Sequence, residues 1–443
     1  MSDENRIKGK ILLIGQIECL SPLHIGSGRD SRSDLDILLD PYGEPFIPAT
    51  SFVGILRHNF PEQFGENFWG YTKDQDGQQS ALCCADLRYV SQEAAEIVVR
   101  DGIQICTETG LAMPHRKFDF ELVERGSRFK LNLELTYREQ DEAFVKQMAC
   151  TIYELLAKQR VHIGARTNSG FGQIRLLEGD TKIHDFDFSK KSDVLHWLTK
   201  DFSQKTSIPL ESLGEPFNLR KKCFSITAML RLKNSLIIRS YSPQPEMPDT
   251  TQLKSKGDWV IPGTSLKGAI RARAKRIVNT LELKNAKEII TELFGNVEDE
   301  NRSKKARKGR IRIQEVNLPG KDFQTESQTR IKIDRFTGGV IEGGLFDSMP
   351  VFASADGGLI ALQIDVFEYK PYEPGLLLLV LKDLWSGDLA VGGEKNIGRG
   401  VFRGVRAEIA WDDEKIMLEE DLSKLPTDKK EVLEKFVTTL VGG

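Results

Sequence analysis

Apolar and polar residues alternate along two segments that open corresponding parts of the chain. The segments are residues 10–20, KILLIGQIECL, and residues 224–234, FSITAMLRLKN. A period of two is typical of a strand with one buried face. Residues 127–137, SRFKLNLELTY, and residues 359–369, LIALQIDVFEY, show the same pattern further along. We therefore expect at least two such strands in each half of the chain.

Helical periodicity follows the first strand in each half. Residues 47–57, IPATSFVGILR, and residues 261–271, IPGTSLKGAIR, place their apolar side chains on one helix face. Thr and Ser are common N-cap residues, so we predict that a hydroxyl caps each helix. A further helix is predicted over 142–159. The resulting order, strand, helix, strand, strand, helix, strand, predicts an α+β fold of the ferredoxin-like type in each half.

Three motifs recur in the same order, which indicates that the chain is a duplication. The first is the IP-x-T-S helix start, repeated after 214 residues. The second pairs TGLAMPHRKFDF (109–120) with TGGVIEGGLFDS (337–348), and the third pairs IGARTNSGFGQIR (163–175) with VGGEKNIGRGVFR (391–403), both 228 residues apart. Because the offset grows once, we predict an insertion in the second half, at the basic stretch 302–312.

Length and composition agree with two globular domains. A chain of 443 residues with 40% apolar and 29% charged residues has material for two cores. We predict a first domain over 1–204, a linker over 205–222 and a second domain over 223–443, which ends in an amphipathic helical tail beginning after residue 411. No apolar run suggests a signal peptide or a membrane segment, so we expect a cytoplasmic protein without membrane contact.

Charge and cysteine content narrow the chemistry. The net charge of −3 argues against a uniformly basic nucleic-acid binder but leaves room for local basic surfaces. Six cysteines without a CxxC pair fit reduced thiols better than disulfides or a zinc site. All six histidines lie in the first half, so a histidine-based RNA cleavage mechanism cannot operate in the second.

Two repeated features are candidate anion sites. Glycine-rich loops present backbone amides to phosphate, and helix N-termini favour negative charge. A tight turn between strands and a structural helix cap are the alternative explanations. The residues concerned are Gly164, Gly170, Gly172, Gly392, Gly398 and Gly400 in the loops, and Thr50, Ser51, Arg57, Thr264, Ser265, Lys267 and Arg271 in the helices.

The motifs LHIGSG, DPYGEPFIPATSFVGILR, IDRFTGGVIEGGLFD and GGEKNIGRG together resemble the RAMP superfamily of CRISPR-associated proteins. The resemblance is to backbone subunits of type III effector complexes, and two fused units are similar to tandem subunits of type III-D-like systems. It implies RRM-like ferredoxin domains that bind guide RNA and meet target RNA and other effector subunits. It also implies β-hairpin thumbs near 103–124 and 331–352, and RNA contacts by Arg335 and Arg399.

The same resemblance implies a catalytic aspartate in the loop before each IP motif. The spacing to the DP pair selects Asp34 over Asp36 in the first half, and Asp249 is the corresponding candidate in the second. Such a carboxylate would hold Mg²⁺ or orient the 2′-hydroxyl for attack on the neighbouring phosphate, which leaves a 2′,3′-cyclic phosphate. A solvated loop acid without catalytic function is the alternative for each.

Three functions follow as hypotheses. The first is a guide-binding subunit that also cleaves bound target RNA. The second is a scaffold that binds RNA in the same kind of complex without cutting. A stand-alone RNA-binding protein with RRM-type stacking is disfavoured, because SGFGQI lacks the leading basic residue and the second aromatic residue of that module.

Overall fold

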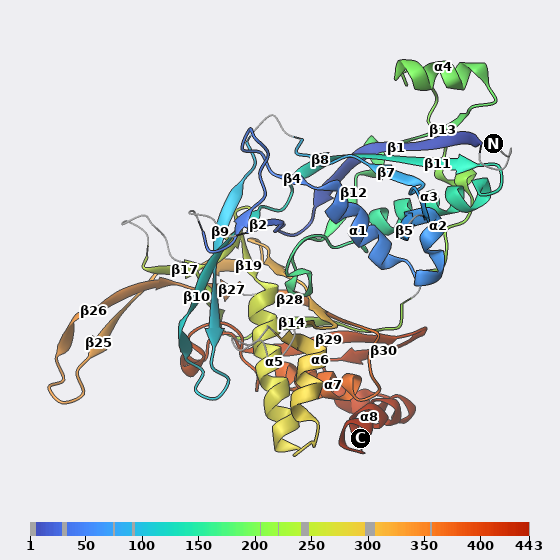
Figure 1. The fold of residues 1–443 in the computed structure, drawn as a ribbon. Helices are drawn as coiled ribbons and strands as arrows, with labels where there is room; N and C mark the ends of the chain where they lie inside the picture. The colour runs from blue at the N-terminus through green and yellow to red at the C-terminus, as the bar shows by residue number, and fades with distance from the viewer. Residues whose placement is uncertain are drawn as a thin grey trace. The chain divides into compact units, whose positions relative to one another are not determined.

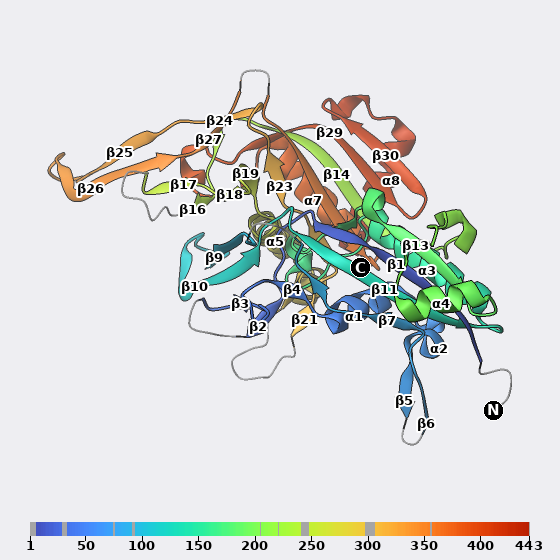
Figure 2. The same ribbon diagram turned by 90° about the horizontal axis from the view of Figure 1, so that it is seen from above.

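The chain forms two compact units (Figures 1 and 2). The computed structural model describes residues 6–28, 33–73, 76–90, 94–203, 205–219, 221–240, 248–296, 306–354 and 357–442. The first unit comprises Met1–Arg100, Asp119–Thr167 and Phe171–Arg220, and the second comprises Asp101–Phe118, Asn168–Gly170 and Lys221–Gly443. The main boundary therefore falls at the end of the predicted linker, while two short segments from the first repeat group with the second unit.

The first unit is built on a ferredoxin-like sheet. Its strand order is β12-β1-β11-β7, all pairs are antiparallel, and β13 also pairs with β1. Helix α1 lies between β1 and β7 in the sequence, and α3 lies between β11 and β12, as predicted. The bounds are β1 (Ile7–Cys19), α1 (Ala49–Asn59), β7 (Leu82–Cys84), β11 (Arg128–Arg138), α3 (Glu142–Ala157), β12 (Ile174–Leu176) and β13 (Lys182–Asp187).

The second unit repeats this arrangement. Its sheet has the order β22-β28-β14-β29-β30, with antiparallel pairs throughout. Two helices, α5 and α6, connect the first two core strands, and α7 connects the next two. The bounds are β14 (Cys223–Leu232), α5 (Gly263–Thr280), α6 (Ala286–Phe294), β22 (Ile311–Ile313), β28 (Leu359–Phe367), α7 (Glu373–Ser386), β29 (Phe402–Trp411), β30 (Glu414–Glu419) and α8 (Thr427–Gly442).

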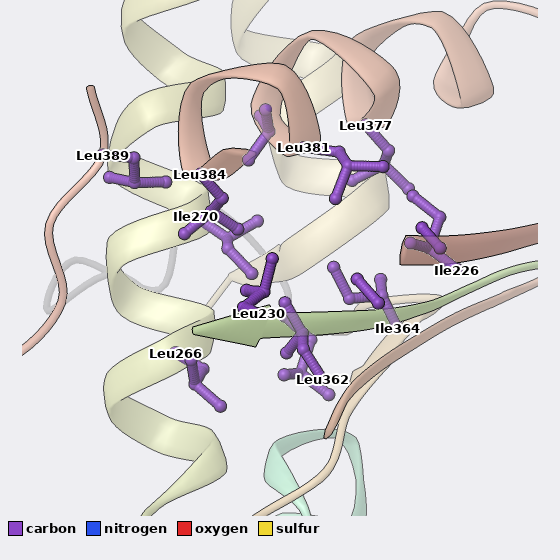
Figure 3. Close-up of a cluster of buried hydrophobic side chains, with 14 of the residues drawn as sticks. Ile226, Leu230, Leu266, Ile270, Leu362, Ile364, Leu377, Leu381, Leu384 and Leu389 are labelled. Atoms are coloured by element: carbon purple, nitrogen blue, oxygen red, sulfur yellow. The ribbon is translucent and has the colours of Figure 1, made fainter. Parts of the chain in front are cut away.

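Alternation along the strands produces the core of the second unit. Ile226 and Leu230 of β14 point to the same side as Leu362 and Ile364 of β28, where α5 and α7 cover them (Figure 3). Each of these side chains is at most 1% exposed. Burying an aliphatic side chain of this size contributes about 1.5–3 kcal/mol, so the pattern of the sequence translates directly into the stability of the sheet and its helices.

Two long β-hairpins occupy the positions expected for the thumbs. The first is formed by β9 (Ile97–Ile105) and β10 (Ala112–Val123), and the second by β25 (Gln328–Ile333) and β26 (Val340–Met349). Both views show β25 and β26 extending away from the sheet of the second unit (Figures 1 and 2). The two tips close with equivalent hydrogen bonds, from Gly110 N to Cys106 O at 2.9 Å and from Gly338 N to Asp334 O at 3.0 Å.

The remaining elements are mostly short strands, which form small sheets separate from the two main sheets. In the first repeat they are β2 (Gly26–Gly28), β3 (Asp36–Ile37), β4 (Phe46–Ile47), α2 (Glu66–Trp69), β5 (Tyr71–Lys73), β6 (Asp76–Gln78), β8 (Leu87–Arg88) and α4 (Lys191–Thr199). In the second they are β15 (Ser235–Leu236), β16 (Arg239–Ser240), β17 (Thr250–Gln252), β18 (Lys254–Ser255), β19 (Asp258–Ile261), β20 (Gly295–Asn296), β21 (Arg307–Lys308), β23 (Val316–Leu318), β24 (Phe323–Thr325) and β27 (Val351–Ala353).

The predicted linker packs on the first unit. Leu213 is only 3% exposed and belongs to the core of that unit, and Ile208, Leu210, Phe217 and Leu219 pack against the same core. Apolar residues in the segment therefore anchor it, and Pro209 and Gly214 flank a short 3-10 helix, Leu210–Leu213. The described part of 205–222 covers the first unit instead of spanning open solvent.

The basic stretch is not a separate insertion. Residues 302–305 lie outside the described residues, but Arg307 and Lys308 form β21, and Ile311 and Ile313 of β22 are completely buried. Gly70 and Gly295 occupy equivalent turns, and their separation of 225 shows that most of the growth in offset precedes the basic residues. The extra length lies mainly in α5 and α6, so the predicted position of the insertion was wrong.

The prediction of a helical tail after residue 411 is only partly correct. Glu414–Glu419 form β30, which pairs with β29 at the edge of the sheet, and the helix α8 begins at Thr427. Alternation in EKIMLE places Ile416 and Leu418 on the buried face, with 4% and 6% of their surfaces exposed. Period-two burial at a sheet edge therefore prevailed over the helical propensity of the Glu and Lys residues.

Candidate nucleic-acid interface and cleavage site

Asp34 lies on the surface of the first unit and is held against the base of the first hairpin. Its backbone N–H donates to the carboxylate of Asp119 at 2.8 Å, and the N–H of Asp119 donates to the carboxylate of Asp34 at 3.2 Å. The next residue is fixed as well, because the N–H of Glu121 donates to the carbonyl of Leu35 at 3.0 Å. An exposed loop carboxylate is thus held in place by the hairpin.

Asp249 occupies the corresponding place in the second unit. It is exposed, and its carboxylate accepts a hydrogen bond from the N–H of Asp347 at 3.0 Å. Strand β17 begins at the next residue and runs parallel to β26, pairing Thr250 with Ser348. The sequence alignment of the repeats places Asp347 opposite Asp119, so both units hold a loop aspartate by the backbone of the same hairpin position.

Asp36 is placed differently from Asp34. Its side chain is 0% exposed and accepts a hydrogen bond from the Ser33 hydroxyl at 2.5 Å. His24, another residue of the first repeat, is 4% exposed, and its Nδ1 lies 2.8 Å from the carbonyl oxygen of Glu121. Both residues are buried, whereas the carboxylate of Asp34 is exposed.

The helix starts are not capped by hydroxyl groups. The N-cap residues are Pro48 in α1 and Pro262 in α5, neither helix has a side-chain cap, and neither has an acidic residue in its first turn. Thr50, Ser51, Thr264 and Ser265 therefore lie inside the first turn. The predicted hydroxyl cap was wrong because the proline, with its fixed φ angle, already takes the position just before the helix.

The exposure of these helix residues is compatible with ligand contact. Thr50, Ser51 and Arg57 are exposed on α1, while Lys267 is half-buried and Arg271 exposed on α5. In the first unit, the carboxylate of Asp86 accepts a hydrogen bond from the Ala49 N–H at 2.8 Å. One anion therefore already occupies the N-terminus of α1, as the helix dipole favours.

Each of these helices also carries a bare glycine. Gly54 in α1 and Gly268 in α5 are exposed, and a methyl group added to either would have no heavy atom within 4 Å. Glycine inside a helix costs about 1 kcal/mol relative to alanine. Packing against the described residues does not account for a glycine at this repeated position.

Packing explains most of the loop glycines. A methyl group on Gly172 or Gly400 would lie 1.8 Å from a carbonyl oxygen of the same unit, and one on Gly164 or Gly392 would lie 2.2 or 2.7 Å from another. Gly398 differs, since its nearest neighbour is 3.7 Å away. All six loop glycines, including Gly170, have positive φ angles, so the turn itself requires them. Their contact with RNA stays a prediction.

Arg399 is buried in a polar network. It is 3% exposed and donates to Glu394 at 2.9 Å, to the Ser235 hydroxyl at 2.7 Å and to Gln328 at 2.6 Å. Glu394 also pairs with Arg330 of β25 at 2.7 Å. Burial alone would raise the pKa of Glu394, but the hydrogen bonds and charges of Arg399 and Arg330 outweigh burial and lower the pKa below its ordinary value. Arg399 thus joins the glycine loop to the base of the hairpin.

The two hairpin tips differ in chemistry. Arg335 is exposed beside Asp334, whose carboxylate accepts the backbone N–H groups of Phe336 and Thr337 at 2.9 and 2.8 Å. These hydrogen bonds lower the pKa of Asp334. Cys106 stands at the position of Asp334 in the first hairpin, and hydrogen bonds with Thr109 lower the pKa of its thiol. The second tip alone combines a basic residue with a fully exposed aromatic ring.

A comparison with known protein families matches both halves of the duplicated fold. A family model described as the RAMP superfamily matches residues 16–175 and 230–403. The chain belongs to the RAMP superfamily. Its two RAMP regions coincide with the two ferredoxin-like sheets, which confirms the predicted tandem fold. Among the helices that the structure describes, none is long and apolar enough to cross a membrane.

One curated relative adds detail to the RAMP assignment. The chain is similar to a protein of Methanocaldococcus jannaschii named "CRISPR system Cms endoribonuclease Csm3", with 23% identity over 243 residues. The match covers 47% of this chain and 92% of the relative. Nearly the whole relative thus corresponds to about half of this chain, in agreement with a tandem pair.

Sequence reasoning named the loop aspartates but missed their partners. Asp119 and Asp347 were aligned by the repeat, and so were Gly54 and Gly268, yet none had a predicted role. The signal that identifies them is recurrence without a packing requirement. A polar residue or glycine that recurs in both repeats, and that the core does not require, indicates a functional position in the same way as a motif.

Proposed function

We propose that this chain is a tandem backbone subunit of a type III CRISPR effector complex, which holds guide RNA and cleaves bound target RNA at both repeats. Its partners are guide RNA, target RNA and other effector subunits. The family assignment and the similarity to a protein named as an endoribonuclease support this function. The observation that carries the cleavage hypothesis is the repeated hydrogen bond from the hairpin backbone to a loop aspartate.

This hydrogen bond has a chemical consequence. Asp34 and Asp249 are each fixed on one carboxylate oxygen, while the other oxygen of each accepts no hydrogen bond from the described residues. A preorganised carboxylate can orient a 2′-hydroxyl, or accept its proton, as it attacks the adjacent phosphate. The hairpin would position the scissile nucleotide, because the same strand holds the aspartate.

Mg²⁺ is the cofactor that this donor set favours. Among the described residues, no group of three or more His, Cys, Asp and Glu side chains is placed to hold a metal ion. Mg²⁺ is commonly held by one or two carboxylates together with substrate phosphates. Asp34 with Asp119, and Asp249 with Asp347, fit that arrangement once RNA supplies the remaining oxygens. The bound ion would stabilise negative charge on the reacting phosphate.

The test uses the assembled complex with guide and labelled target RNA. Asp34→Asn and Asp249→Asn keep a hydrogen-bond acceptor for the hairpin N–H but remove the charge. Each should erase one of two cuts that are separated by the footprint of one repeat, with a rate loss of about 10²–10⁴-fold. Glu342→Gln, which removes an exposed carboxylate from β26, is the matched control and should leave both cuts intact.

Two outcomes would change the conclusion. Unchanged fragments in both aspartate variants would favour the scaffold function, in which the chain binds RNA without cutting. Loss of RNA binding together with cleavage would show that the variants disturb assembly rather than chemistry. Mapping the fragments with Mg²⁺ and with EDTA separates a metal requirement from the requirement for each aspartate.

A further inference from the structure

Each glycine loop contains one left-handed residue that is not glycine. In the loop of residues 391–403, Glu394 has a φ angle of 53°, whereas the other left-handed positions are glycines. In the loop of residues 163–175, Arg166 stands at the position of Glu394 and has a φ angle of 57°. A left-handed backbone costs free energy at any residue with a Cβ atom. A charged side chain at this place in both repeats therefore indicates that the side chain itself is needed.

Backbone hydrogen bonds attach the two loops in the same way. In the second repeat, the N–H of Gly393 donates to the carbonyl of Ile237 at 2.8 Å. In the first repeat, the N–H of Ala165 donates to the carbonyl of His24, also at 2.8 Å. Both acceptors lie in the segment that follows the first core strand. Because the attachment is equivalent, the difference between the repeats at this place lies in the side chains.

Glu394 is the centre of an ionic network in the second repeat. Only 9% of its side chain is exposed, and its carboxylate accepts hydrogen bonds from Arg399 at 2.9 Å and from Arg330 of β25 at 2.7 Å. The guanidinium of Arg239 in β16 lies 3.3 Å from the same carboxylate. Since Arg399 and Arg330 keep the pKa of Glu394 below its ordinary value in spite of burial, the carboxylate is charged at neutral pH.

The network extends to the hairpin residue that holds Asp249. Arg399 also donates to the side chain of Gln328 at 2.6 Å, and Gln328 pairs with Ser348 across β25 and β26. The residue before Ser348 is Asp347, whose N–H donates to the carboxylate of Asp249 at 3.0 Å. A short series of hydrogen bonds and one strand pair thus connects the network with the loop aspartate.

The first repeat makes the same connection with aromatic rings. Phe171 stands at the position of Arg399 and is completely buried. Its ring contacts that of Phe120 with centroids 5.9 Å apart, and the guanidinium of Arg166 lies over Phe120 at 4.5 Å. Phe120 directly follows Asp119, the hairpin residue that holds the loop aspartate of this repeat. A cation on stacked aromatic rings therefore replaces a buried carboxylate among arginines.

We propose that Glu394 is a positioning residue: it fixes the base of the β25–β26 hairpin through two arginines and so sets the place of Asp249. Where it concerns cleavage, this inference rests on the proposed function. Loss of the charge would leave the buried guanidinium of Arg399 without its carboxylate, and breaking a buried ion pair in this way disturbs the structure around it. The first repeat has no such carboxylate, so the second site alone depends on it.

The first experiment measures cleavage by the assembled complex with guide and labelled target RNA, and Asp249→Asn identifies the cut of the second repeat. Glu394→Gln keeps the shape of the side chain and removes its charge. It should slow the second cut by about 10–100-fold, because a displacement of about 1 Å is enough for such a loss. The first cut and the affinity for target RNA should be unchanged, whereas a general loss of structure would reduce both. Glu420→Gln removes an exposed carboxylate that pairs with Arg403, and this matched control should leave both cuts unchanged.

The second experiment needs no cleavage. Hydrogen exchange of the full chain, measured by mass spectrometry, should be faster in Glu394→Gln at residues 328–333 and 340–349, and unchanged at residues 97–105 of the first hairpin. Unchanged exchange in the second hairpin would overturn the positioning role. Faster exchange in the variant, together with a wild-type complex that never cuts, would refute the cleavage function and keep the role of Glu394 in holding the hairpin.

Two further variants keep the proposal falsifiable if Glu394→Gln does not fold. Arg330→Gln removes one partner at a partly exposed position of β25 and should also slow the second cut alone. Glu394→Asp keeps the charge and suits a left-handed backbone, so it should retain more of the second cut than the Gln variant. An unchanged second cut in Arg330→Gln, or an equal loss in the Asp and Gln variants, would show that the charge of Glu394 does not position the site.

Discussion

Gly268→Ala should stabilise the protein and weaken its binding to RNA at the same time. The residue lies inside α5, is exposed and has a φ angle that alanine adopts without strain. A methyl group there would meet no heavy atom within 4 Å. Any penalty from the substitution must therefore come from a molecule outside the chain, and any gain must come from the helix itself.

Both magnitudes follow from the structure. Replacing glycine by alanine in an exposed helix interior stabilises by about 0.8–1.0 kcal/mol. For a domain of this size, that gain raises the melting temperature by about 2–4 °C. A methyl group between Lys267 and Arg271 would push the RNA backbone away from one or two cations. Each lost contact with a single strand lowers the affinity about 5-fold near 0.1 M salt.

The assay compares thermal unfolding and RNA affinity of the same preparations. Asn279→Ala is the matched control, because it raises helix propensity at an exposed position near the other end of α5. It should raise the melting temperature without changing RNA affinity. Gly268→Ala should raise the melting temperature and lower the RNA affinity.

Two results would refute the reasoning. A lower melting temperature in Gly268→Ala would mean that the space around this glycine is occupied by the chain itself. Unchanged RNA affinity, with the expected gain in stability, would mean that no RNA backbone approaches α5. In that case the repeated glycines would be left without a functional explanation.

Two further predictions concern charge and backbone. RNA affinity should fall between pH 7 and pH 9, because the pKa of Lys267 is lowered to about 8 and neighbouring Arg271 keeps its charge. Lys267→Arg should bind RNA equally at both pH values. An identical fall in that variant would show that Lys267 does not cause the pH dependence. Gly400→Ala should abolish soluble folding, because its methyl group would lie 1.8 Å from the Val391 carbonyl oxygen. Gly398→Ala should destabilise the protein by only about 1–3 kcal/mol, the cost of a left-handed backbone at alanine. Thermal unfolding measures both effects.

The sequence predicted the sheet strands well because their burial follows a period of two. Strands β1, β11, β14 and β28 all lie within the segments expected from alternation, give or take three residues. Helix α7 was missed, since EPGLLLLVLKDLWS is apolar almost all round and shows little helical periodicity. Its burial between the sheet and α8 explains the pattern, but only the fold reveals that environment.

The candidate site was predictable only in part. The family resemblance named Asp34 and Asp249, and the spacing to the DP pair selected Asp34 over Asp36. Their hydrogen bonds with the hairpin residues 119 and 347 depend on which strands meet, and the sequence does not state this. The resemblance implied an RNA contact by Arg399, whereas its burial against Glu394 is seen only in the structure.

The two repeats have kept one feature in common and let another diverge, and the difference bears on how the protein works. The hairpin hydrogen bond to a loop aspartate occurs in both, as expected if both repeats act on target RNA. Lys267 of α5 occurs in the second repeat alone, since Val53 stands at its position in the first. If the chain binds RNA as proposed, tethering gives one repeat a high effective RNA concentration once the other repeat is bound. Under the proposed function, high affinity in one repeat would then be enough for both repeats to cut the same target RNA.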